Sequence, residues 1–168
     1  MIVRPATTDD FARLQEIELA AGRAFADVGL PAIADDDPFS IAELEAYRRA
    51  GTLWVLADAA GVVGYVAVDV LDGCAHIEQV SVHPESGRRG LGRRLVDHVS
   101  DWAATRSLGA LTLTTFRDVP WNAPLYARYG FRVMSDAEVG PELRARCEEE
   151  ADDGLDPTLR VCMVRTVH

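Results

Sequence analysis

Lysine is absent from this sequence, and all 17 of its basic residues are arginine. A lysine general base, a lysine Schiff base and the lysine of a phosphate-binding P-loop are therefore excluded. Acidic residues number 27, so the formal net charge at neutral pH is −10. This excess of negative charge disfavours nucleic acid as a partner. It fits a cationic ligand, and it fits plain solubility equally well.

Cysteine and long hydrophobic runs are also scarce. The three cysteines, Cys74, Cys147 and Cys162, form no C-x-x-C pair, which predicts reduced structural thiols and no metal site. The longest apolar run, Val62–Val68, is interrupted by Gly64 and is too short to span a bilayer. The first ten residues lack the apolar stretch of a signal peptide. We therefore expect a cytoplasmic protein with no membrane partner.

The 168 residues are 48% hydrophobic and 26% charged, which predicts a single globular domain, 1–168, with a sizeable core. Strand-like patterns and turn residues predict seven strands, with Pro5 placing the first at an edge: Ile2–Pro5, Thr52–Ala57, Val62–Val70, Ala75–Val82, Leu111–Phe116, Phe131–Met134 and Leu159–Val164. Helical spacing predicts five helices: Phe11–Gly22, Ile41–Gly51, Gly90–Ser107, Asn122–Gly130 and Pro141–Ala151. Residues 24–38 are predicted to form an irregular loop, and Gly109 to cap the long helix. This order predicts an α+β (mixed α/β) fold.

A glycine-bearing loop lies between the strand that ends at Val82 and the longest predicted helix. Its glycines, Gly87, Gly90 and Gly92, allow backbone amides to converge at a helix N-terminus, where the helix dipole favours an anion. Arg88, Arg89, Arg93 and Arg94 crowd into seven positions around the same point, so a phosphate or pyrophosphate is the natural ligand. The spacing G-x-x-G-x-G is neither the G-x-G-x-x-G of a dinucleotide fold nor a Walker loop.

Two sequence blocks resemble one known family. Val80–Pro84 (VSVHP), followed by GRRGLGRRLV, resembles the acyl-CoA signature of the GNAT superfamily of N-acetyltransferases. Leu111–Phe131 (LTLTTFRDVPWNAPLYARYGF) is similar to the later strand and helix of that family, with its terminal Tyr-x-x-x-Gly-Phe. The resemblance extends from Ile2 to the last strand. It implies a mostly antiparallel central sheet flanked by helices, with acyl-CoA bound at the strand, loop and helix around residues 80–93, and acetyl-CoA as the acyl donor.

The resemblance also implies which residues hold the cofactor. The backbone of Val80 and Val82 would pair with the pantetheine arm, and the amides of residues 88–93 would surround the pyrophosphate. The implied cofactor-binding residues are Val80, Ser81, Val82, Arg88, Arg89, Gly90, Leu91, Gly92, Arg93 and Asn122. Gly87 departs from the pattern, because the family usually has Gln or Arg there. The family's usual cofactor-binding Asn falls on Val119, so Asn122 either contacts CoA or only caps a helix.

Acetyl transfer to an amine needs a base for the amine and a proton for the leaving thiolate. Tyr126 occupies the family's tyrosine position, and a phenol can donate to a thiolate. Strand alternation places His76 and Glu78 on the face that also carries Val80 and Val82. Glu78 is the first choice of base, and His76 acts with it or alone. Thr114 and Thr115 stand where many relatives have a Glu, so that alternative base is missing.

These observations predict an acetyl-CoA-dependent N-acetyltransferase that acts on a primary amine by direct attack in a ternary complex. Nothing in the sequence activates Cys74 as an acetyl carrier. The acceptor stays open among small amines, amino acids, antibiotics and protein amines, and by analogy residues 25–38 and 141–156 frame its entrance. The sequence leaves the oligomeric state open, with a homodimer among the alternatives. The alternative function is a non-catalytic acyl-CoA-binding sensor or scaffold.

Overall fold

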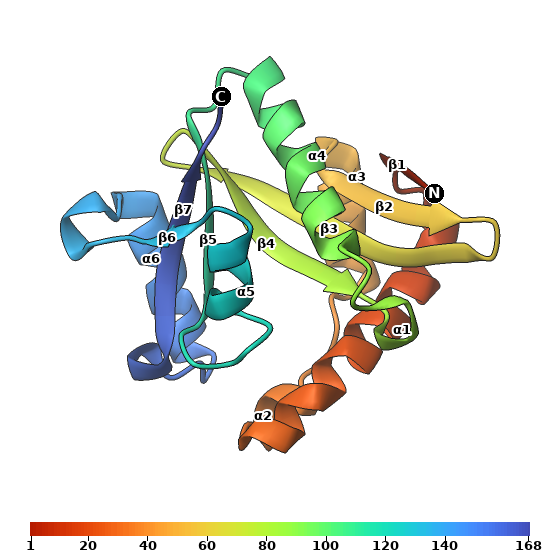
Figure 1. The fold of residues 1–168 in the computed structure, drawn as a ribbon, viewed down its shortest axis with the longest axis horizontal. Coiled ribbons are helices and arrows are strands. Elements are labelled where there is room, and N and C mark those ends of the chain that lie inside the picture. The colour runs from red at the N-terminus through yellow and green to blue at the C-terminus, as the bar shows by residue number, and fades with distance from the viewer. The chain divides into compact units, whose positions relative to one another are not determined.

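The computed structural model describes residues 1–168. Its seven strands form a mostly antiparallel sheet in the order β1-β2-β3-β4-β5-β7-β6, flanked by helices (Figure 1). The strands are β1 Ile2–Pro5, β2 Leu53–Asp58, β3 Gly61–Leu71, β4 Cys74–Val82, β5 Ala110–Phe116, β6 Arg132–Val133 and β7 Arg160–Thr166. The helices are α1 Phe11–Gly22, α2 Pro31–Ala34, α3 Ile41–Ala50, α4 Leu91–Thr105, α5 Ala123–Arg128 and α6 Pro141–Asp152. The predicted mixed α/β fold is confirmed, and β1 with its Pro5 lies at the edge of the sheet.

The chain divides into two compact units. The first comprises Met1–Val68 and Gln79–His98, and the second comprises Asp69–Glu78 and Val99–His168. Strands β3 and β4 and helix α4 each contribute residues to both units. That the whole chain acts as a single domain stays a prediction.

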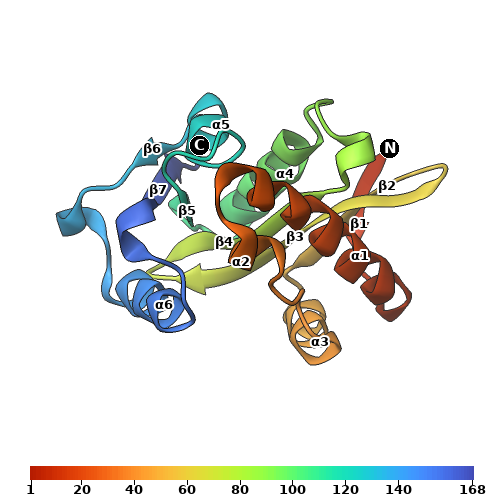
Figure 2. The ribbon, with the colours of Figure 1, turned by 90° about the horizontal axis from the view of Figure 1, so that it is seen from below.

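In the first unit, two layers of side chains pack on opposite faces of strands β2 and β3. Helices α1 and α3 bury Leu14, Ile17 and Leu44 against one face, which includes Leu53 and Tyr65. The first half of α4 covers the other face: the Trp54 ring meets the His98 ring edge-on, with centroids 5.2 Å apart. Figure 2 shows α3 and α4 on opposite sides of these strands. A Cβ on Gly64 would lie 2.9 Å from the carbonyl oxygen of Ser81 and 3.4 Å from Leu95, so glycine permits the close packing there.

In the second unit, β5 pairs antiparallel with β7 over its whole length, from Ala110 opposite Thr166 to Phe116 opposite Arg160. Strand β6 pairs with the other edge of β7. Helices α5 and α6 lie on opposite sides of β5 and β7 (Figure 2). Strand β4 pairs parallel with β5 at Ala75 and His76.

Asp72, in the turn between β3 and β4, holds the start of α6. Its carboxylate accepts hydrogen bonds from the backbone amides of Glu142 (3.0 Å) and Leu143 (2.9 Å), two of the amides that a helix N-terminus leaves without helical partners. A Cβ on Gly140 would lie 2.4 to 2.7 Å from the same carboxyl group. Glycine at position 140 therefore allows this contact across about seventy residues of sequence.

Two local predictions were wrong. Residues 24–38 are not wholly irregular, because they contain a 3-10 segment, Arg23–Val28, and the short helix α2. Proline at the first position of α2 fits a helix start. Gly109 does not cap α4; Ser107 instead takes the left-handed conformation beyond its end, with φ +57°, and Leu108 donates to the carbonyl oxygen of Ala103.

Candidate active site

Backbone hydrogen bonds and two left-handed residues define the loop between β4 and α4. A 3-10 turn, Pro84–Ser86, follows His83, whose amide donates to the carbonyl oxygen of Val63 (2.8 Å). Arg88 and Gly90 both have left-handed backbones, with φ of +62° and +70°. The first helical hydrogen bond runs from the amide of Arg94 to the carbonyl oxygen of Gly90 (3.2 Å). The amides of residues 91–93 precede this bond and have no helical acceptor, so they form a site suited to an anion.

The arginines of this loop differ in their partners. Arg94 donates to the carbonyl oxygen of Met1 (2.8 Å), and Arg93 lies 3.7 Å from the carboxylate of Asp97. Arg88 and Arg89 are exposed, and no carboxylate in the structure forms an ion pair with either of them. Two guanidinium groups therefore stand beside the glycine loop with their charge uncompensated, which raises the local attraction for a phosphate.

The glycine at position 87, where the family has Gln or Arg, has a local explanation. Its amide donates to the carbonyl oxygen of Pro84 (3.1 Å), closing the 3-10 turn. A Cβ at this position would lie 3.2 Å from the same carbonyl oxygen, closer than an ordinary van der Waals contact. A side chain here would need a shift of a few tenths of an ångström in the turn, and the loop keeps its backbone amides without the usual side chain.

Strand β4 carries the other predicted cofactor contacts. Ser81 is buried, and its hydroxyl accepts a hydrogen bond from the side-chain amide of Gln79 (2.8 Å). Val80 and Val82 are half-buried. The printed sheet register of β4 with β5 joins Ala75 to Leu111 and His76 to Thr112.

His76 and Glu78, two of the predicted catalytic residues, lie together. The carboxylate of Glu78 lies 3.5 Å from Nε2 of His76, and Nδ1 of His76 is 3.0 Å from the hydroxyl of Thr112. His76 is 0% exposed and Glu78 is 21% exposed. Only Glu78 of the two can therefore contact a ligand that approaches through solvent.

Glu78 also has partners that no sequence pattern predicts. The guanidinium of Arg146, from α6, forms an ion pair with Glu78 and with Asp69, the latter at 2.9 Å. Burial raises the pKa of Glu78, but the hydrogen bond to His76 and the charge of Arg146 outweigh it, so its pKa is lowered overall. Glu78 is therefore ionised at neutral pH. The sequence pattern predicted a helix at residues 141–151 and gave no signal for this contact.

Tyr126 lies on α5, with its ring packed edge-on against those of Tyr129 (centroids 6.0 Å apart) and Phe131 (5.9 Å). Burial, with a smaller effect of Tyr129, raises the pKa of the Tyr126 phenol. No hydrogen bond of the structure engages its hydroxyl. A phenol in this environment stays protonated at neutral pH and keeps its proton available for a ligand.

Asn122 occupies the N-cap position of α5, but its side chain does not cap the helix. Its amide oxygen accepts instead from the backbone amide of Phe116, at 3.4 Å, so the side chain reaches back to the end of β5. Asn122 therefore stands at the N-cap position but makes no capping hydrogen bond with its side chain. The alternative, that Asn122 contacts CoA, stays a prediction.

A carboxylate reaches Thr114 even though the strand itself has no Glu there. The Thr114 hydroxyl donates to the carboxylate of Glu150, from α6, at 2.8 Å. Arg160 of β7 lies 3.4 Å from the same carboxylate. No sequence pattern pairs Glu150 with β5, so this contact could not be predicted.

The predicted residues divide between the two units. The loop 83–93 and Val80–Val82 belong to the first unit, while His76, Glu78, Tyr126 and Asn122 belong to the second. The structure brings His76 next to Glu78 and places Tyr126 and Asn122 on or beside α5.

No cluster of three or more His, Cys, Asp or Glu side chains has a geometry suited to a metal ion. None of the helices combines the length and apolar character needed to cross a membrane.

Several solved structures share this fold. N-acetylglutamate synthase from Neisseria gonorrhoeae, complexed with coenzyme A and N-acetyl-glutamate, matches 99% of this chain with 22% identity and a TM-score of 0.72, although this chain spans only 35% of that protein. The PaiA N-acetyltransferase from Thermoplasma acidophilum, complexed with coenzyme A, matches with 12% identity and a TM-score of 0.70, covering 98% of both chains. The ribosomal-protein-S18-alanine N-acetyltransferase from Escherichia coli matches with 18% identity and a TM-score of 0.69, covering 99% of this chain and 93% of that one.

The amino-acid sequence also matches a family of acetyltransferases. A family model described as the acetyltransferase (GNAT) family matches residues 14–131. This range includes β4, the glycine loop, α4 and the Tyr-x-x-x-Gly-Phe block around Tyr126. The match covers well over half of the chain, and the chain belongs to the acetyltransferase (GNAT) family.

Proposed function

We propose that this protein is an N-acetyltransferase that transfers the acetyl group of acetyl-CoA to a primary amine. The observation that carries the proposal is the start of α4, where Gly90 holds a left-handed backbone and the amides of residues 91–93 lack helical acceptors. Two structural relatives of the chain are complexed with coenzyme A, whose pyrophosphate is the kind of anion that such a helix start binds. Direct attack of the amine in a ternary complex is the proposed mechanism.

The donor would be held by backbone groups and by charge. The amides of the 88–93 segment would donate to the pyrophosphate, with Arg88 and Arg89 adding charge. The pantetheine arm would pair with the strand edge at Val80 and Val82, as a peptide strand adds to a sheet. This binding mode uses few side chains, which fits a loop built from glycine and arginine.

The reaction forms a C–N bond and breaks the C–S bond of the thioester. In the proposal, Glu78 accepts a proton from the amine, directly or through water, because it is ionised and partly exposed. Buried His76, with Nε2 3.5 Å from the Glu78 carboxylate, positions Glu78. Tyr126 donates its phenolic proton to the departing thiolate, since burial keeps that phenol protonated. Each group thus starts in the protonation state that its role requires.

Acetyl-CoA should raise the melting temperature of the protein. A ligand that binds only the folded state adds RT ln(1 + [L]/Kd), about 2.7 kcal/mol at a hundredfold excess over Kd. Calorimetry would measure the binding heat and the shift directly. If millimolar CoA gives neither heat nor a thermal shift, the assignment of the donor is wrong.

Measurement of turnover distinguishes the proposed enzyme from the alternative function, an acyl-CoA-binding sensor or scaffold. Release of free CoA with a panel of small amines, aminoglycoside-type antibiotics, amino acids and N-terminal peptides would identify an acceptor. The panel includes amino acid and protein amines because structural relatives are named for glutamate and for a ribosomal-protein alanine. Binding of acetyl-CoA with no release from any amine would favour the non-catalytic alternative.

Glu78→Gln tests the assignment of the base. The change removes the ionisable group at nearly constant volume, so kcat/KM should fall most near neutral pH, where the amine still carries its extra proton. The defect should shrink as the pH approaches the pKa of the amine, because the base is then no longer needed. A pH series of initial rates with an accepted amine would measure this trend.

His76→Gln tests the alternative assignment, in which His76 and not Glu78 is the base. Because His76 is wholly buried, its replacement should lower kcat/KM less than Glu78→Gln does. A larger loss at His76 than at Glu78 would transfer the role of base to the histidine.

A further inference from the structure

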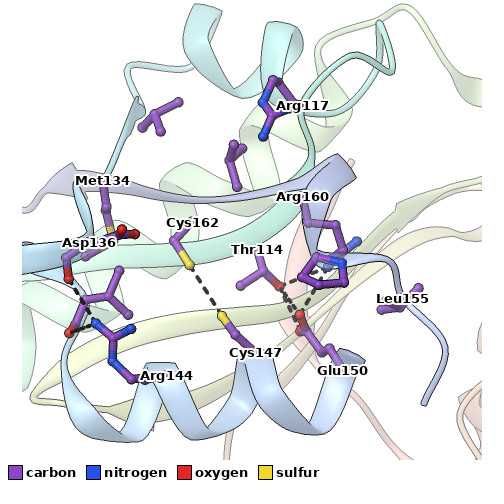
Figure 3. A pocket seen from close by; sticks show the side chains of 14 residues that line it. Thr114, Arg117, Met134, Asp136, Arg144, Cys147, Glu150, Leu155, Arg160 and Cys162 are labelled. Carbon is purple, nitrogen blue, oxygen red and sulfur yellow. Dashed lines mark hydrogen bonds and ion pairs between the residues drawn. The ribbon is translucent and has the colours of Figure 1, made fainter. Parts of the chain in front are cut away.

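Two cysteines that the proposed reaction does not use lie in contact on α6 and β7. The Sγ atoms of Cys147 and Cys162 are 3.4 Å apart, and neither is in a disulfide. Both line a cavity of about 390 Å³ in the second unit, which Figure 3 shows between the helix and the strands. The cysteine spacing predicted only reduced structural thiols, so this pairing is a feature of the tertiary structure.

The helix and the strand are held together beside the two thiols. On β7, Cys162 stands opposite Thr114 of β5, and the Thr114 hydroxyl donates to Glu150, which lies three residues after Cys147 on α6. Arg160, two residues before Cys162 and on the same strand face, contacts the same carboxylate at 3.4 Å. Leu143, one turn before Cys147, is buried. Contacts on both sides of the thiols therefore fix their separation.

The two thiols differ in their electrostatic state. The hydrogen bond with Cys162 lowers the pKa of Cys147, and the charges of Arg160 and Arg144 add to this against the effects of burial and of Glu150. The same hydrogen bond, with burial, raises the pKa of Cys162. Cys147 is thus the better thiolate of the two. Both side chains are only half-buried, so a small molecule in the cavity can reach them.

We propose that Cys147 and Cys162 form a redox-active pair that a hydroperoxide, entering the cavity of the second unit, converts into a disulfide joining α6 to β7. The Cys147 thiolate attacks the O–O bond of the peroxide, forms an S–O bond and releases water or an alcohol. The Cys162 sulfur then attacks the resulting sulfenic acid, and its proton leaves with the hydroxyl group as a second water. Two thiols are oxidised by two electrons and one peroxide is reduced. A small-molecule dithiol reverses the step.

The test uses the fully reduced protein and one equivalent of hydrogen peroxide. We expect two of the three thiols to be lost, a single peptide link between Cys147 and Cys162, and recovery of both thiols with dithiothreitol. Cys74 is the internal control, because burial and Asp72 raise its pKa and its only hydrogen bond is a weak one to a backbone carbonyl. Cys147 should react at least about tenfold faster than Cys74. Equal reactivity of the three thiols, or a link involving Cys74, would overturn the proposal.

Variants separate the two chemical roles. Cys162→Ser should stop the reaction at a sulfenic acid on Cys147, which dimedone traps, whereas Cys147→Ser should abolish the fast phase. Cys74→Ser should leave the loss of two thiols unchanged. Peptide mapping of the wild-type protein requires no variant, so failure of a variant to fold leaves the test decisive. A fast reaction that persists in Cys147→Ser would contradict the assignment of the nucleophile.

Discussion

Replacement of Gly90 by valine should abolish measurable binding of acetyl-CoA. Gly90 has φ +70° at the start of α4, a conformation that costs a β-branched residue on the order of 1–3 kcal/mol. The variant would relieve that strain by rebuilding the loop, and the amides of residues 91–93 would lose their common direction. Each lost hydrogen bond to a charged group costs about 1.5–3 kcal/mol, so the loss of two corresponds to a fall in affinity of at least about a hundredfold. Titration calorimetry measures the effect.

Gly51→Val is the matched control for this variant. Gly51 has nearly the same backbone conformation, φ +74°, at the end of α3, and a Cβ at either glycine would meet no atom within 4 Å. Gly51→Val should therefore lower the melting temperature by a similar mechanism and leave the affinity for acetyl-CoA unchanged. Equal losses of affinity in the two variants would mean that Gly90→Val acts only through stability.

Arg93→Ala separates the charge of the loop from its backbone geometry. Arg93 is exposed and lies 3.7 Å from Asp97, so removal of its partly screened charge should weaken binding only modestly. The dependence of the affinity on salt concentration should become flatter. If Arg93→Ala and Gly90→Val had equal, small effects, the model in which backbone amides hold the pyrophosphate would be wrong.

Tyr126→Phe should lower kcat by about 10²–10⁴-fold, the usual contribution of general acid catalysis, while the affinity for acetyl-CoA stays nearly intact. The change keeps the ring contacts with Tyr129 and Phe131 and removes only a hydroxyl that has no hydrogen-bond partner in the structure. Because burial raises the pKa of Tyr126, the phenol is protonated from about pH 6 to about pH 9. The loss should therefore be the same across that range.

Tyr129→Phe provides the comparison, because its ring belongs to the same aromatic cluster. It should leave kcat within about twofold of the wild-type value, as expected for a residue outside the proton transfer. Rates are measured with an amine from the CoA-release panel at saturating acetyl-CoA. Full kcat in Tyr126→Phe at every pH would make the tyrosine structural, and the thiolate would then leave unassisted or take its proton from water.

The elements of the fold were largely predictable because their signals are local. Helical spacing and Gly51 predicted α3, and Gly51 does end that helix with a left-handed backbone. Strand-like runs and the turn residues between them predicted β2, β3 and β4 within one or two residues of their ends. The loop 83–93 was predictable for the same reason, since glycines, arginines and a helix start lie within eleven consecutive residues. Errors arose where the chain lacks one dominant signal, as at residues 24–38.

The sequence alone determined the glycine loop, the order of the elements and the family to which the chain belongs. The tertiary structure decided which side chains share an environment. Arg146 reaches Asp69 and Glu78 across 77 and 68 residues, Asp72 caps a helix about seventy residues away, and Cys147 meets Cys162. Such contacts depend on how α6 packs against the strands, and the 3.6-residue period of a helix specifies which residues share a face but not which partner that face meets. For that reason the lowered pKa of Glu78 and the proximity of the Cys147 and Cys162 thiols follow from packing and not from any local pattern.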